Sequence, residues 1–341
     1  MRIIGQILEI LLKIIVIVLV ITVTFAVSLI LLSGPYEEPP EIVPELPPTF
    51  EDLIPQGSRN DSDVMVSLLL GVEIIQLPLE IYLIGAVSAE MPASFELEAL
   101  KAQAVAARTN VLYKMHVMPN LRHPNAQACT DYTCCMAYSD DESLRERWGD
   151  DYIRYITRVI GTVLDTDGVY ISYNGNPIFA AFHSSSAGKT EASENVWITD
   201  LPYLTSVDSP ETPELVPGFI TTVSVPKQDF KDKIANVRPD AVFGASEGSW
   251  ITEIMHTESG RILELTIGGA VFKGTELRSM FSLRSTAVSY EWIDGDIVFT
   301  VTGNGHGVGM SQYGANAMAI DRNNFKSILN HYYTGTELLP P

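Results

Sequence analysis

An unbroken run of apolar residues, IIVIVLVITVTFAVSLILL, occupies residues 14–32. As a helix it would be about 28 Å long, close to the roughly 30 Å hydrocarbon core of a bilayer. A cleaved signal peptide is the alternative, but its apolar region normally has about 7–15 residues and ends at a small-residue cleavage site. No such site follows this run, so the pattern predicts an uncleaved single-pass anchor.

The charges around this run predict its orientation. Arg2 and Lys13 precede it, whereas glutamates at 37, 38, 41 and 45 follow it. The positive-inside rule places residues 1–13 in the cytoplasm and the rest of the chain outside the cell membrane. Residues 33–61 are rich in proline and glutamate and predict an extended linker. The folded ectodomain is therefore expected at residues 62–341.

Periodicity predicts the first elements of the ectodomain. Residues 64–83 are mostly apolar and are interrupted by Gly71 and Pro78, which predicts one or two strands and then a short helix that begins at Pro78. Residues 95–115 carry apolar side chains at spacings of three and four, with Ser94 as a candidate N-cap. This alanine-rich segment is the strongest helix prediction in the chain.

The remaining pattern predicts mainly strands. Residues 117–150 are polar and irregular, and they form an insertion that contains all three cysteines. Strands are expected at 152–164, 170–173, 177–182, 262–267 and 296–302, with an Asn-Gly turn at 174–175. Because no regular strand–helix alternation recurs, we expect an α+β fold with several strands and a substrate groove.

Composition restricts the class of protein. Hydrophobic residues make up 46% of the 341 residues, which excludes wholesale disorder. Asp and Glu outnumber Lys and Arg by 42 to 22, so the formal net charge is -20. A chain this acidic lacks the positive surface that grips a phosphate backbone, and nucleic-acid binding is not expected.

Three segments resemble one known family: LEIYLIGAVSAEMPASFELEALKAQAVAARTNVLY at 79–113, FHSSSAGKTEASENVW at 182–197, and GNGHGVGMSQYGA at 303–315. Together they resemble the SpoIID/LytB family over residues 64–335. The resemblance implies a peptidoglycan lytic transglycosylase that acts on glycan strands without stem peptides during sporulation engulfment. It also implies two partners, an engulfment amidase/endopeptidase and a membrane scaffold protein.

Glu90 is the candidate catalytic residue. It lies among apolar residues ahead of the long predicted helix, where burial should raise its pKa and let it protonate a glycosidic oxygen. The alternative is a glutamate that partners a helix N-terminus. The resemblance assigns Glu90 the catalytic role. A hydrolase would need a second carboxylate about 5–10 Å away; the candidates are Glu191, Glu194 and Asp208.

The other motif residues are candidate glycan-binding groups. On the long helix, Gln103 and Arg108 are either solvent-facing or, as the resemblance favours, support the groove. The second and third segments supply polar donors and aromatic faces: His183, Ser184, Ser186, Lys189, Thr190, Trp197, His306, Gln312 and Tyr313. The spacing in these segments fits neither a phosphate-binding loop nor a serine nucleophile elbow. The family usually has Gly-Gly where this chain has Ala187-Gly188, and an alanine there would be strained if its φ were positive.

The cysteine cluster predicts a metal site. His123, Cys129, Cys134 and Cys135 offer one imidazole and three thiolates, a set that fits a closed tetrahedral structural zinc site. The resemblance implies zinc here in some members, with a different His/Cys mixture. A disulfide from Cys129 to Cys134 or Cys135 is the main alternative, since the domain is expected outside the cell. A catalytic cysteine is the third and weakest alternative.

A binding module is the second function considered. The LytB-type relatives are described as modifiers of cell-wall amidases, which suggests a non-catalytic protein that binds the wall and activates an amidase. Glu90 favours the enzyme, because glycan binding alone requires no buried acid.

Overall fold

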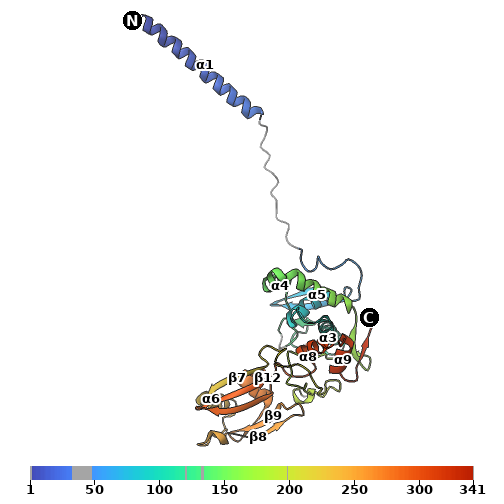
Figure 1. Ribbon diagram of the computed structural model, residues 1–341. Coiled ribbons are helices and arrows are strands. Elements are labelled where there is room, and N and C mark those ends of the chain that lie inside the picture. The colour runs from blue at the N-terminus through green and yellow to red at the C-terminus, as the bar shows by residue number, and fades with distance from the viewer. Residues whose placement is uncertain (1, 33–47, 120, 132–133, 198, 341) are drawn as a thin grey trace. The chain divides into compact units, whose positions relative to one another are not determined.

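The computed structural model describes residues 2–32, 48–119, 121–131, 134–197 and 199–340 (Figure 1). They belong to two units, residues 1–47 and Pro48–Pro341, which are treated separately. The first unit contains α1 (Arg2–Leu32), a helix that includes the predicted anchor and has no buried side chain. Its length and apolar composition are those of a helix able to cross a membrane. Residues 33–47 of the predicted linker lie outside the described residues.

The folded unit begins at Pro48, earlier than the predicted residue 62. Phe50 is buried, and so is the carboxylate of Asp61, which pairs with Arg108. The linker prediction is therefore wrong for residues 48–61. The prediction failed because proline and acid content suggest an extended segment, whereas residues far along the chain bury the side chains of Phe50 and Asp61.

The first hydrophobic core is built around α3 (Leu97–His116), which is buried over most of its length from Ala99 to Val111. Four helices pack against it: α2 (Leu79–Glu90), α5 (Tyr152–Asp165), α8 (Gln312–Ile320) and α9 (Phe325–Tyr332). Alanines on α3 allow this close approach. The helix begins two residues later than predicted, and its N-cap is Glu96 without a side-chain cap bond, not Ser94.

Short strands surround these helices. β1 (Met65–Leu70) pairs antiparallel with β2 (Glu73–Pro78) and parallel with β3 (Ala128–Cys129), so the cysteine segment joins the first hairpin. β4 (Tyr170–Tyr173) pairs with β5 (Asn176–Pro177) and β14 (Glu337–Leu339). β6 (Phe182–His183) pairs in parallel with β13 (Met310–Ser311). The strands expected before Pro78, the helix after it and the turn at 174–175 are confirmed.

Residues 152–164 form α5 and not the predicted strand. Their β-branched content suggested a strand, but the buried side chains Tyr152, Ile156, Val159, Ile160 and Val163 recur at three to four residues and form one helical face against α3. The preceding helix, α4 (Asp141–Trp148), lies in the segment predicted to be irregular and is N-capped by Asp140. Periodicity thus outweighs strand propensity here.

A second hydrophobic core lies within residues 225–301. Two antiparallel sheets build it, in the orders β11-β12-β7 and β10-β9-β8. Their strands are β7 (Ile220–Pro226), β8 (Ile251–His256), β9 (Ile262–Ile267), β10 (Ala270–Lys273), β11 (Val288–Ile293) and β12 (Asp296–Thr302), with helices α6 (Lys227–Val237) and α7 (Gly274–Met280). Figure 1 shows these strands gathered apart from α3, α8 and α9. The fold is thus a mixed α and β fold.

Candidate functional site

A cavity of about 520 Å³ lies beside the C-terminal end of α2. This volume is in the range of small-molecule sites, roughly 300–1,000 Å³. Segments far apart in the sequence line it: Ser88, Ala89, Glu90, Met91, Pro92, Ala93, Ser94, Arg147, Trp148, Tyr155, Ser184, Gln312 and Tyr313. Four of the predicted site residues, Glu90, Ser184, Gln312 and Tyr313, therefore meet in one place.

Glu90 is the last residue of α2 and lines the cavity. Burial raises the pKa of its carboxyl, while a hydrogen bond from the peptide N–H of Ala137 (2.6 Å) and the nearby amide of Gln312 oppose the rise. The alternative role, as partner of a helix N-terminus, does not fit this position. At a helix C-terminus the dipole disfavours the carboxylate, so it also favours a protonated acid.

The glycine-rich segment brings the second and third motifs together. Gly303, Gly305, Gly307 and Gly309 all have positive φ. A Cβ at Gly309 would lie 2.0 Å from the carbonyl oxygen of Ala181, so only glycine permits the approach that pairs β13 with β6. Ser311 then N-caps α8, and the peptide N–H of Tyr313 donates to the carbonyl oxygen of Ser184 (3.0 Å). The pairing of β13 with β6 thus brings Ser184, Gln312 and Tyr313 together in one wall of the cavity.

Arg147, Trp148 and Tyr155 also line the cavity, and the sequence analysis missed all three. They come from α4 and α5, in segments predicted to be irregular or extended. The Trp148 and Tyr155 rings pack edge to face with centroids 5.6 Å apart. Both rings are half-buried and line the cavity, and such rings suit the apolar faces of sugars. Once α4 and α5 are recognised as helices, the aromatic residues at 148 and 155 are a sequence signal for this wall.

Three residues of the second motif are buried and do not line the cavity: His183, Ser186 and Thr190. His183 lies between Ser186, whose Oγ is 2.7 Å from Nε2, and the carbonyl oxygen of Val308, 3.2 Å from Nδ1. Burial lowers the pKa of His183 well below its ordinary value. Thr190 is fully buried, and its hydroxyl accepts a hydrogen bond from the peptide N–H of Val207 (2.9 Å). Ala187 is not among the positive-φ residues, so the departure from Gly-Gly carries no strain.

Trp197, His306 and Lys189 do not line the cavity. The Trp197 and His306 rings pack at 5.1 Å between centroids, and burial lowers the pKa of His306 to about 4. The Lys189 side chain is half exposed, with Nζ 3.9 Å from a carboxylate oxygen of Asp208. These side chains are thus separate from the group around Glu90.

Gln103 and Arg108 lie in the core and not at a surface. Both are fully buried on α3, which rules out the solvent-facing alternative. Arg108 binds Asp61 through two nitrogens and also donates to the carbonyl oxygen of Val169 (3.0 Å). Contact with a sugar is therefore excluded for Arg108, and its role is packing.

Glu90 is the one carboxylate among the residues that line the cavity. The predicted second carboxylates lie elsewhere. Glu191 is buried and accepts hydrogen bonds from Thr257 and Ser259 (both 2.6 Å), while Glu194 and Asp208 are outside the lining. The paired arrangement that hydrolytic glycosidases normally use is thus not present among the lining residues.

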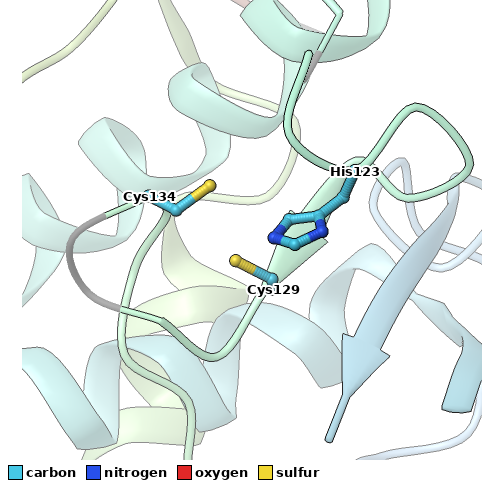
Figure 2. Close-up of side chains that lie close together, drawn as sticks. All are labelled: His123, Cys129 and Cys134. Carbon is cyan, nitrogen blue, oxygen red and sulfur yellow. The ribbon is translucent and has the colours of Figure 1, made fainter. Parts of the chain in front are cut away.

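The predicted metal ligands gather in the insertion between α3 and α4. One ligand atom each of His123, Cys129 and Cys134 lies within 4.8 Å of the others, and Figure 2 shows the three side chains turned toward a common centre. Cys135 Sγ lies 3.7 Å from Cys134 Sγ and 3.0 Å from Lys114 Nζ. Cys129 is buried, and Cys134 and Cys135 are half-buried. Soft sulfur donors with one imidazole fit zinc, so the cluster could hold a metal.

The cysteine segment also supports Glu90. Ala137, which donates to Glu90, follows Cys135 by two residues. The next residue, Tyr138, stacks on Tyr82 of α2 with ring centroids 5.8 Å apart. Tyr138 crosses α2 at Gly85, where a Cβ would lie 2.3 Å from its ring. The position of residues 135–138 therefore determines where the Glu90 carboxyl is held.

Comparison with known proteins agrees with these motifs. The family model described as "Stage II sporulation protein" (SpoIID) matches residues 72–173. Stage II sporulation protein D of Bacillus subtilis (strain 168) is 37% identical over 264 residues, which cover 77% of this chain and 74% of that protein. The Bacillus amyloliquefaciens protein of the same name is 35% identical over 262 residues, with the same coverage. The amidase enhancer of Bacillus subtilis (strain 168) is 29% identical over 304 residues, 74% of this chain and 40% of that protein. On this likeness, which spans most of the folded unit, the chain belongs to the SpoIID family of stage II sporulation proteins.

Proposed function

We propose that this protein is a peptidoglycan lytic transglycosylase. It cleaves the bond between N-acetylmuramic acid (MurNAc) and N-acetylglucosamine (GlcNAc) in strands whose stem peptides have been removed, during sporulation engulfment. The observation that carries the proposal is Glu90, the one carboxylate in the cavity lining, with a pKa raised by burial. A protonated carboxyl at this position is the general acid that the reaction requires.

One carboxyl suffices for the proposed reaction. Glu90 donates its proton to the glycosidic oxygen as the bond from C1 of MurNAc to that oxygen breaks. The resulting carboxylate then takes the proton from the C6 hydroxyl of the same sugar, whose oxygen attacks C1. The products are a GlcNAc hydroxyl and a 1,6-anhydroMurNAc end, and Glu90 is protonated again. A hydrolase would need a second group to activate water.

The polar and aromatic residues that line the cavity would bind the sugar rings. Trp148 and Tyr155 offer faces on which sugar rings pack, and Gln312 offers an amide to the acetamido groups. Zinc held by His123, Cys129, Cys134 and Cys135 would cross-link the insertion structurally, because four protein ligands leave no open position. Such a cross-link would keep the segment through Ala137 in place against Glu90.

The proposed location follows from α1. We place residues 1–13 in the cytoplasm and the folded unit outside the mother-cell membrane, facing the septal wall. An amidase/endopeptidase that removes stem peptides and a membrane scaffold protein are the partners we propose. The proposal of an amidase partner is supported by a relative whose name is amidase enhancer.

That same relative supports a second candidate function, a wall-binding activator of an amidase without catalysis. Peptide-free glycan digested with the full chain and analysed by mass spectrometry separates the two. Ends of 1,6-anhydroMurNAc support the transglycosylase, reducing ends indicate a hydrolase, and intact glycan with a stimulated amidase supports the activator. Glu90→Gln should abolish cleavage, a loss of about 10²–10⁴-fold, whereas Glu194→Gln, outside the cavity, should leave it intact.

A further inference from the structure

Arg147 is a cation in the cavity, and none of the described residues is its anionic partner. It is the one basic residue in the lining, as Glu90 is the one acidic residue. Its hydrogen bonds go to neutral oxygens: Nη1 donates to the carbonyl of Ser88 (3.1 Å) and Nη2 to Ser139 Oγ (2.8 Å). Within the part of the chain that the structure describes, some arginines have carboxylate partners, such as Arg59 and Arg108, whereas others also donate to carbonyl oxygens, such as Arg158, Arg278 and Arg284. Arg147 differs from all of these in lining the cavity, where a ligand can reach its guanidinium.

The two segments that position Glu90 also hold the guanidinium of Arg147. Ser88 precedes Glu90 by two residues on α2, and Ser139 follows Ala137, the donor to Glu90, by two residues. Arg147 is nevertheless exposed to solvent. A guanidinium has five N–H donors, and two are used here. The remaining donors are available to a ligand, in an orientation that the two tethers fix in advance.

We infer that Arg147 binds a carboxylate carried by the same sugar that Glu90 cleaves, namely the free lactyl group of peptide-free MurNAc. This inference rests on the proposed function. The lactyl ether is attached at C3 and the cleaved bond at C1 of one ring, so one cavity can bind both. While the stem peptide is attached, the lactyl carbonyl belongs to a neutral amide. Peptide removal converts it to a carboxylate, which arginine binds in bidentate geometry.

Arg147 would then determine which glycan is cleaved. A strand with its peptides has a neutral amide in place of the lactyl carboxylate, and this amide would leave the arginine without an ion pair at that position of the occupied cavity. A purely mechanical role, in which Arg147 only ties α4 to α2, predicts no dependence on the sugar's charge. The charge of the substrate therefore separates the two roles.

The test uses the full chain in detergent and two forms of one substrate. Peptide-free glycan is compared with the same glycan after carbodiimide coupling with ammonia, which turns each lactyl carboxylate into a carboxamide. We expect the parent to release 1,6-anhydro ends from the carboxylate form with kcat/KM about 10-fold to 100-fold higher. Arg147→Gln should bring this ratio to about 1, and Arg147→Lys should keep part of it. Lys326→Gln, which removes a charge on α9 outside the cavity, should keep the parental ratio.

Each other result overturns the inference. If Arg147→Gln slows both substrates equally, the residue is only a structural tie. If the parent cleaves both forms equally, the carboxylate is not recognised, although the proposed transglycosylase stands. If the parent cleaves neither form, the proposed function fails and the inference with it. The comparison within the parent protein needs no variant, so a folding defect in Arg147→Gln cannot obscure the answer.

Discussion

Arg108 and Asp61 form a bidentate ion pair inside the folded unit, with Arg108 Nη2 2.6 Å from Asp61 Oδ2 and Nε 2.9 Å from Oδ1. Their side chains are 0% and 3% exposed. The pair joins a conspicuous arginine of the long helix to a residue predicted to lie in a linker. It therefore determines where the folded unit begins.

Two truncations should separate these boundaries. A chain that starts at residue 62 lacks Asp61 and leaves Arg108 buried without its counter-ion, which costs about 3–5 kcal/mol. Natural domains have only about 5–15 kcal/mol of stability, so this chain should unfold or melt far lower. A chain that starts at residue 48 should melt as the parent does. Equal denaturant midpoints for the two truncations would contradict the assignment.

The anchor should contribute location and not chemistry. Removing residues 1–47 deletes α1, while every residue that lines the cavity remains. We expect a soluble protein that cleaves purified glycan at about the parental rate but fails in the cell, because tethering raises local concentration without adding contacts. A well-folded but inactive truncation, by circular dichroism and product analysis, would show a further role for the anchor.

Glu90 should make stability depend on pH. Burial raises its pKa above the ordinary value of 4.5, so the folded chain binds this proton more tightly than the unfolded chain. The stabilisation of the folded chain by this proton is present in full below the ordinary pKa of 4.5, and it is lost as the pH rises through the raised pKa. Glu90→Gln does not titrate. Its melting temperature relative to the parent should therefore rise between about pH 4 and pH 8. A difference that is flat or falls with pH would show that the carboxyl is not buried as described.

Gly85 should be intolerant of a methyl group. A Cβ there would lie 2.3 Å from the Tyr138 ring and 2.7 Å from the carbonyl oxygen of Ser139, so the segment that supports Glu90 must shift. Gly85→Ala should lower both the melting temperature and glycan cleavage. Gly161→Ala on α5 is the matched control: nothing lies within 4 Å, and a helical alanine should stabilise by about 0.5–1 kcal/mol. If both variants behave like the control, the contact with Tyr138 is not constraining.

The cysteine cluster should bind one zinc ion per chain. Elemental analysis of the purified protein measures it, and Cys129→Ser should lose the metal and melt at a lower temperature. Cys135→Ser tests the fourth ligand, whose sulfur also contacts Lys114. Because Ala137 lies two residues beyond Cys135, a chelator should also reduce cleavage. A metal-free protein with a mapped Cys–Cys peptide would establish the disulfide alternative instead.

Local patterns in the sequence determine much of this protein. The apolar run at 14–32 requires a helix that buries its side chains in something other than the folded unit. The spacing at 95–115 predicts α3, and Gly71 with Pro78 predicts one or two strands and the start of α2. Glu90 and the His/Cys cluster also stand out from their neighbours alone. These features depend on residues within a few positions of each other, which is what periodicity and spacing record.

Tertiary structure decides the remainder, because its causes are contacts between distant residues. From the sequence, Arg108 resembles a surface cation. In the structure it is paired with Asp61, which lies 47 positions earlier in the chain. Arg147 and Trp148 belong to a segment without a recognisable motif and join Glu90 only because α4 packs beside α2. His183 is the last residue of β6 and is buried, whereas Ser184, the residue after that strand, lines the cavity. Sequence identifies the acid at position 90, but only packing determines which side chains surround it.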